Sequence, residues 1–156
     1  MPTSLESASA GAELLDVVAR LNRWVTRHTV WTLPVAQARV LSQIDEMQAT
    51  RVSDLARAQH CSQPTMTSLV RRLQDQGLVA RTPDPDDARA AWISLTDEGG
   101  QALADIRRAR ADIIESLIQR LTAADRQRLR GAQKALTSLL DAAYRQTPPQ
   151  QEHPRS

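Results

Sequence analysis

Two helix-start signals stand close together near the middle of the chain. Ser53 and Ser62 are each typical of an N-cap, because a serine hydroxyl accepts a hydrogen bond from a backbone N–H at the start of a helix. Pro64 fits the first turn of the second helix, where its missing N–H has no partner to lose, and Gly77 is typical of a helix end. Two short helices joined by a tight connection at residues 59–61 have the spacing of a helix-turn-helix.

Apolar residues on both sides of this motif recur every three or four positions, as in helices with one buried face. We expect a first helix to begin at Glu13, a second at Pro34, and two long helices to follow Thr96 and Thr122. Thr122 with Asp125 resembles a capping box, in which side chains at a helix start satisfy its first N–H groups. The chain is therefore predicted to be mainly helical.

Between the helix-turn-helix and Thr96 the pattern changes to short, alternating runs. Residues 78–82 and 90–95 read as two strands, and the stretch PDPDDAR between them is typical of a turn. Within that turn we interpret Asp84 and Asp86 as solvated residues that cap their own backbone. The pattern predicts a mainly α fold with a small β-hairpin wing: a winged helix-turn-helix core flanked by N- and C-terminal dimerisation helices.

The second helix of the motif separates into two faces at 100° per residue. One face is apolar and is predicted to pack inward: Met66, Leu69, Val70 and Leu73. The other carries groups that pair with base edges in the major groove of DNA: Gln63, Pro64, Thr67, Ser68 and Arg71. Contacts to the DNA backbone are predicted for Ser53, Ser62, Thr65 and Arg72. The alternative is an ordinary solvated face, although such faces usually carry mixed Glu and Lys pairs.

These elements divide the chain into successive parts. They are a disordered N-terminus (1–10), an N-terminal dimerisation helix (11–33), the winged helix-turn-helix DNA-binding core (34–99), C-terminal dimerisation helices (100–145) and a disordered tail (146–156). The helices at both ends carry long apolar faces, which a second copy of the chain could cover.

Composition limits the remaining functions. The 156 residues suit one domain, and a net charge of +2 with a pI near 9.3 permits nucleic-acid binding without establishing it. The single cysteine excludes an intrachain disulfide, and neither a signal peptide nor a membrane span is visible, so we expect a cytoplasmic protein. The histidines show no metal-ligand spacing and no catalytic motif is present, so neither a metal site nor an enzyme is predicted.

The segments SQPTMTSLVRRLQDQGLVART, DPDDAR and ISLTDEG, in this order, resemble the MarR family of bacterial transcription regulators over about Pro34 to Gly99. The resemblance implies a homodimer that binds a palindromic double-stranded operator, represses transcription and is released by a small ligand. It also implies that Arg89 enters the minor groove from the wing tip, with Asp87 as its acidic partner. This agrees with the attraction of arginine to narrow, A·T-rich minor grooves. Ala88 stands where relatives often carry a second basic residue.

Two further features bear on regulation. The resemblance implies a pocket for a small aromatic or anionic effector, and its candidate residues lie near the end of the first helix: Trp24, Arg27, His28 and Trp31. Plain packing at a helix end is the alternative. Cys61, just before the Ser62 cap, is a candidate redox switch, although a lone cysteine in a turn is more often a small filler. For the whole chain, the remaining alternative is a helical dimerisation or adaptor module that does not bind DNA. No cofactor is expected.

Overall fold

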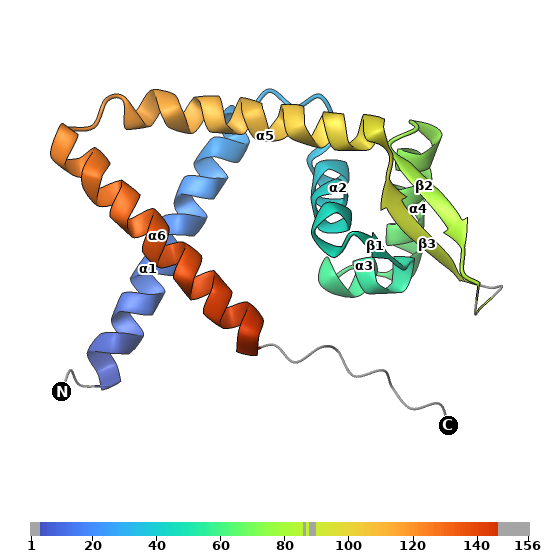
Figure 1. The fold of residues 1–156 in the computed structure, drawn as a ribbon, viewed down its shortest axis with the longest axis horizontal. Coiled ribbons are helices and arrows are strands. Elements are labelled where there is room, and N and C mark those ends of the chain that lie inside the picture. The colour runs from blue at the N-terminus through green and yellow to red at the C-terminus, as the bar shows by residue number, and fades with distance from the viewer. Residues whose placement is uncertain (1–3, 86, 88–89, 147–156) are drawn as a thin grey trace. The chain divides into compact units, whose positions relative to one another are not determined.

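The computed structural model describes residues 4–85, 87 and 90–146, and the side chains of residues 10–85, 87 and 90–145 (Figure 1). The chain forms two compact units, residues 1–114 and residues 115–156. The first unit contains α1 (Ser4–His28), α2 (Val35–Met47), β1 (Ala49–Thr50), α3 (Val52–Ala58), α4 (Gln63–Asp75), β2 (Val79–Pro83), β3 (Ala91–Leu95) and most of α5 (Asp97–Ile118). The second contains the end of α5 and α6 (Ala123–Gln146). The predicted fold class, mainly helical with a small β wing, is confirmed.

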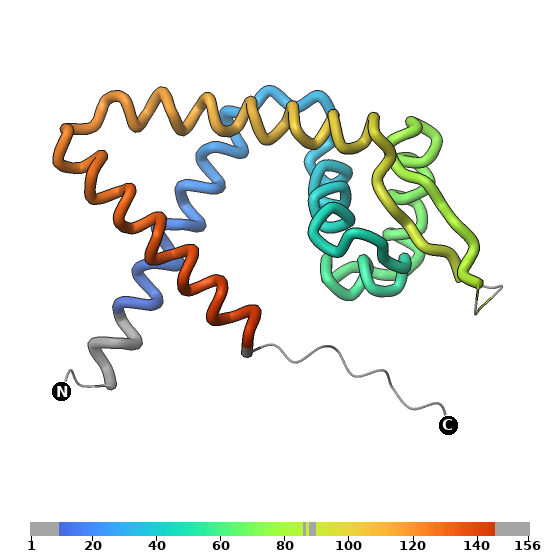
Figure 2. The backbone as a smooth tube through the Cα atoms, in the orientation of Figure 1, coloured from blue at the N-terminus to red at the C-terminus, as the bar shows by residue number. Residues whose placement is uncertain are grey.

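The strands form one antiparallel sheet in the order β1-β3-β2. β2 and β3 make the predicted hairpin (Figure 2). Their pairing runs from Val79 opposite Leu95 to Pro83 opposite Ala91. β1 is absent from the prediction, since two residues are too few to show an alternating pattern. It pairs with β3 and brings the segment between α2 and α3 onto the sheet.

A core of aliphatic side chains joins the helices of the winged helix-turn-helix to the sheet. Leu41 and Ile44 of α2, Leu55 of α3, Met66 of α4 and Ile93 of β3 are each 0% exposed. Burying one such side chain stabilises a fold by roughly 1.5–3 kcal/mol relative to leaving it in water. The hydrophobic effect therefore fixes α4 against α2, α3 and the sheet, and this packing decides which face of α4 remains exposed.

The first helix differs from its prediction. α1 begins at Ser4, well before the expected start at Glu13, so the structure is helical in most of the segment that was predicted to be disordered. Residues 4–12 are rich in Ala and Ser but have no apolar stripe, so a periodicity search does not detect their helix. Further along α1, several large apolar side chains are exposed: Leu14, Leu15, Val17, Val18 and Leu21.

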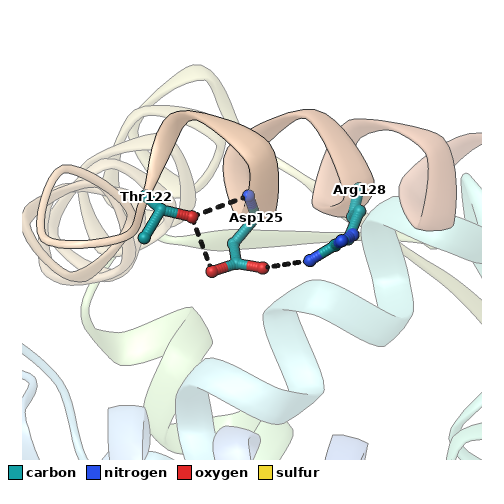
Figure 3. Close-up of polar contacts among 3 residues, drawn as sticks. All are labelled: Thr122, Asp125 and Arg128. Carbon is teal, nitrogen blue, oxygen red and sulfur yellow. Dashed lines mark hydrogen bonds and ion pairs between the residues drawn. The ribbon is translucent and has the colours of Figure 1, made fainter.

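The predicted caps of α4 and α6 are confirmed. The Ser62 hydroxyl accepts the Thr65 N–H at 3.3 Å at the start of α4. The Thr122 hydroxyl accepts the Asp125 N–H at 3.1 Å and donates to the Asp125 carboxylate at 2.7 Å, and Arg128 pairs with the same carboxylate at 2.9 Å (Figure 3). These side chains satisfy N–H groups that have no partner inside the helix.

The predicted cap at Ser53 is wrong. α3 begins at Val52, after Arg51, whose backbone is extended (φ −94°, ψ 155°), and Ser53 lies within the first turn. The N–H of Leu55 already bonds to the Arg51 carbonyl at 3.1 Å. Because pairing of β1 with β3 fixes the chain up to Thr50, the helix starts earlier than the local cap signal indicates.

The start of α5 is docked on the start of β2. Thr96 caps α5 as predicted: its hydroxyl accepts the Gly99 N–H at 3.0 Å and donates to the Gly77 carbonyl at 2.6 Å. The Thr96 N–H bonds to the Leu78 carbonyl at 3.2 Å. A Cβ atom on Gly99 would lie 1.9 Å from the Leu78 carbonyl oxygen. Glycine alone fits at position 99 without a shift of the backbone.

Candidate nucleic-acid interface

Helix α4 presents the two faces that its sequence predicts. Met66, Val70 and Leu73 are at most 1% exposed, and Leu69 is partly buried against the same core. The opposite face is exposed and consists of Gln63, Pro64, Thr67, Ser68 and Arg71. This face offers both donors and acceptors, and it carries no carboxylate that would repel a phosphate. Its chemistry suits the edges of bases in a major groove.

The N-terminus of α4 is exposed beside this face. The hydroxyls of Ser62 and Thr65 lie 2.7 Å apart, and both residues are exposed. The positive end of the helix dipole makes such a terminus favourable for a phosphate. Two of the residues predicted to contact the DNA backbone, Ser62 and Thr65, are therefore adjacent here. A third, Arg72, is exposed nearer the other end of the helix.

A groove of about 310 Å³ lies between α3, α4 and the hairpin. It is lined by Arg51, Val52, Ser53, Gln63, Thr67, Arg81, Asp87, Ala90 and Ala91. Ser53 therefore lines the predicted interface although it does not cap α3. Arg51 and Arg81 were missed by sequence reasoning. Arg81 lies in the predicted strand 78–82, and strand alternation alone would place it on the side of the apolar Val79, so the local pattern gave no signal that it lines a groove.

The acidic turn is not uniformly solvated. The Asp84 side chain is 2% exposed and forms an ion pair with Arg51, so the interpretation of Asp84 as a solvated, self-capping residue is wrong. The Arg51 guanidinium also lies 5.1 Å from the centre of the Trp92 ring, a cation–π distance. Since the paired residues are 33 positions apart, local turn patterns could not reveal their contact.

The wing tip is described in part. Backbone bonds close it, since the Asp84 N–H bonds to the Ala90 carbonyl at 3.1 Å and the Ala90 N–H bonds to the Asp87 carbonyl at 2.9 Å. Asp87 is exposed and lines the groove. Three tip residues lie outside the described part of the chain: Asp86, Ala88 and Arg89. The pairing of Asp87 with Arg89 therefore stays a prediction.

The four candidates for an effector pocket are divided between two places. Trp24 stacks on His28 with ring centres 3.9 Å apart, and Trp24 and Arg27 line an open hollow of about 660 Å³ along α1. Trp31 instead donates its indole N–H to the Thr26 carbonyl at 3.0 Å and lines a separate cavity of about 230 Å³. The cavities described in this structure thus do not bring the four side chains into one pocket.

The cavity beside Trp31 lies between α1, α2 and α5 and combines an apolar wall with arginines. The Arg110 guanidinium lies 5.6 Å from the centre of the Trp31 ring and donates to Asn22 Oδ1 at 2.7 Å. Arg39 and Arg107 line the same cavity. An aromatic surface beside several guanidinium groups is suited to a small aromatic anion.

Cys61 is half-buried and packs against the core, and its N–H bonds to the Ala56 carbonyl at 3.0 Å. This environment favours the small-filler interpretation over a redox switch. Across the residues that the structure describes, no three His, Cys, Asp or Glu side chains are grouped as metal ligands. Within the same residues, no helix combines the length and apolar character that crossing a bilayer requires.

Comparisons with known proteins agree with this geometry. The model of the MarR family matches residues 33–91. An uncharacterised HTH-type transcriptional regulator of Mycobacterium bovis is 27% identical over 135 residues, which cover 86% of this chain and 94% of the relative. The crystal structure of a transcriptional regulator from Thermotoga maritima superposes with a TM-score of 0.69 at 24% identity, covering 92% of this chain and 100% of the other. A mutant MepR from S. aureus bound to an oligodeoxyribonucleotide superposes with a TM-score of 0.57 at 18% identity, covering 86% and 97%.

Proposed function

We propose that this chain, a DNA-binding transcriptional regulator of the MarR family whose model matches residues 33–91, acts in the cytoplasm as a homodimeric repressor that a small ligand releases from a palindromic operator. The observation that carries the proposal is the exposed face of α4, polar and without a carboxylate, beside a groove that contains Arg51 and Arg81. A protein bound over a promoter hinders RNA polymerase, so repression is the simplest consequence of binding there.

In this proposal α4 lies in the major groove with its polar face against the bases. Arg71 can donate two hydrogen bonds to a guanine, Gln63 can pair with an adenine, and the Thr67 methyl group can contact a thymine methyl. The Thr67 hydroxyl donates to the Gln63 carbonyl at 2.8 Å, which leaves its methyl group as the main recognition surface. Arg51 and Arg81 at the groove, with the α4 N-terminus, supply charge for the phosphates on either side.

The apolar faces of the outer helices support the homodimer. Several large apolar side chains of α1 are exposed in the single chain, and α6 exposes a second set: Leu129, Leu136, Leu139, Leu140 and Tyr144. Monomeric proteins rarely leave such contiguous surfaces in water. We assign the covering partner to a second copy, because a palindromic operator presents two equal half-sites about one helical turn apart and needs two copies of α4.

The cavity between α1, α2 and α5 is the effector site that we propose. Trp31 would stack on an aromatic ligand, while Arg39, Arg107 and Arg110 would attract its negative charge. An anion that draws Arg110 away from Asn22 would loosen a contact between α5 and α1, and α5 leads directly from the hairpin. Of the original candidates, the proposal keeps Trp31 and assigns Trp24, Arg27 and His28 to the surface of α1.

Selection of DNA from a randomised pool tests the central claim. We expect an enriched inverted repeat that binds at least about 10³-fold tighter than random DNA at ~150 mM salt. If the selected DNA binds no tighter than random DNA, specific reading by α4 is wrong and an adaptor module becomes the better interpretation. Arg71→Ala provides the internal comparison, since it should relax the base preference without unfolding an exposed helix face.

Two measurements test the finer claims separately. Sedimentation at micromolar concentration should give a dimer, and Leu139→Glu on α6 should shift it toward monomer; a monomeric wild-type chain would refute the dimer.

A series of aromatic carboxylates should raise the melting temperature of the protein and weaken its binding to the operator. Arg39→Gln, which keeps the Arg110–Asn22 contact, should weaken both effects while leaving operator binding without ligand in place. Equal responses from the variant and the wild type would remove this cavity as the effector site.

A further inference from the structure

We propose that the Arg51–Asp84 ion pair is a positioning device that holds the wing at a fixed inclination to the helix-turn-helix. The inference rests on the proposed DNA binding and gives Arg51 and Asp84 a positioning role. In this role Asp84 does not contact DNA. It orients the wing tip through its ion pair with Arg51, which belongs to the helix-turn-helix.

The pair connects two parts of the interface that are distant in sequence. Arg51 is the last residue before α3, and Asp84 follows β2 at the base of the wing tip. The Asp84 side chain is 2% exposed, whereas the Arg51 side chain is 40% exposed. The buried partner therefore belongs to the wing, and the half-exposed partner belongs to the face that lines the groove.

A second contact restricts the same guanidinium. Arg51 lies 5.1 Å from the centre of the Trp92 ring on β3, and Asp84 is tied by its N–H to the Ala90 carbonyl across the hairpin at 3.1 Å. The planar group of arginine can pair with a carboxylate at its edge and stack on a ring with its face, which an ammonium group does less well. Both strands of the wing are thus linked to the start of α3.

Charge alone does not account for Asp84. A carboxylate beside a DNA-binding groove repels phosphates, so electrostatics by itself would favour an uncharged residue at this position. A buried carboxylate also requires a cation nearby, because leaving it unpaired costs more than an exposed pair would contribute. The acid is therefore useful only if it orients a neighbouring group. The group to be oriented is the tip that follows it, since a fixed base lowers the entropy lost when a long side chain enters a minor groove.

The two explanations predict opposite signs for Asp84→Asn. Removing a negative charge near DNA should strengthen binding if only electrostatics matter. If the pair positions the wing, the variant should bind an operator with A·T-rich flanks about tenfold more weakly, the scale of a lost coupling between contacting residues. Its affinity for the same operator with G·C-rich flanks should change little, because an A·T-rich minor groove is what the wing tip is expected to recognise.

Three further variants make the test decisive. Asp105→Asn breaks an exposed ion pair with Arg108 (3.2 Å) on α5 and gives the same change of charge, so it should leave the flank preference unaltered. Arg51→Lys keeps the charge but not the planar group, so it should lose part of the preference. In an Arg89→Ala background, Asp84→Asn should have no additional effect on the flank preference, because the side chain that the ion pair is proposed to orient is then absent.

The readout is the ratio of the affinity for the operator with A·T-rich flanks to the affinity for the operator with G·C-rich flanks. It is measured on protein whose active fraction is determined by stoichiometric titration. Partial unfolding lowers the active fraction for both probes equally and does not change the ratio. A wild-type chain that binds a selected operator but shows no flank preference, or an Asp84→Asn variant that keeps the preference or binds more tightly, overturns the positioning role. A wild-type chain that selects no operator refutes the proposed function instead.

Discussion

Replacing Gly99 with alanine tests how closely the start of α5 packs against the backbone of Leu78. The new Cβ would lie 1.9 Å from the Leu78 carbonyl oxygen and would have to move by roughly 1 Å to reach the 3.0 Å that real Cβ contacts respect. Overpacking of this kind costs about 1–3 kcal/mol. The shift would also strain the 2.6 Å bond from Thr96 to the Gly77 carbonyl, worth about 1 kcal/mol. Alanine also stabilises the helix by about 1 kcal/mol relative to glycine through its higher helix propensity, which offsets part of the loss.

The net expectation is a loss of roughly 1–3 kcal/mol in the free energy of unfolding. The neighbouring residue provides a matched control, because Gly100 lies in the same helix and a Cβ there would meet nothing within 4 Å. Gly100→Ala should therefore stabilise the chain by about 0.5–1 kcal/mol. Urea unfolding followed by circular dichroism, at one fixed protein concentration, measures both. If the two variants change stability in the same direction, the docking of α5 on β2 is not as tight as described.

Other predictions concern the interface and its regulation. Arg71→Ala should cost about 1–3 kcal/mol of operator binding and should relax one base position; a loss that is uniform over all operators would argue for a phosphate contact. Arg89→Ala should weaken binding most on A·T-rich flanks, and equal losses on G·C-rich flanks would contradict insertion into the minor groove. Cys61→Ser should bind DNA like the wild type and respond identically to peroxide; protection by the substitution would instead identify a redox switch.

Local signals predicted much of this fold because the responsible interactions are local. The cap at Ser62 and the division of α4 into apolar and polar faces depend on residues within one or two turns, and the structure confirms both. The hairpin was found from strand patterns with boundaries correct to one residue. These features place α4 and the wing, so the exposed polar face of α4 was predictable from the sequence.

The predictions that the structure contradicts have a different cause from those that it confirms. Ser53 is not a cap because pairing of β1 with β3 sets where α3 begins, and Asp84 is not solvated because Arg51 reaches it from another element. Both depend on contacts between segments far apart in the chain. The candidate effector residues divided for a similar reason: Trp31 turns toward α5, whereas Trp24 stacks on His28 within α1.

The order of the strands also bears on how the protein avoids aggregation. β2 lies at one edge of the sheet, and its last residue is Pro83, which has no N–H to donate to an incoming strand. β1 lies at the other edge and is only two residues long. Short strands and edge prolines are devices that stop exposed sheet edges from recruiting strands of other molecules. Copies of the chain can therefore expose their hairpins to one another without adding strands to a shared sheet.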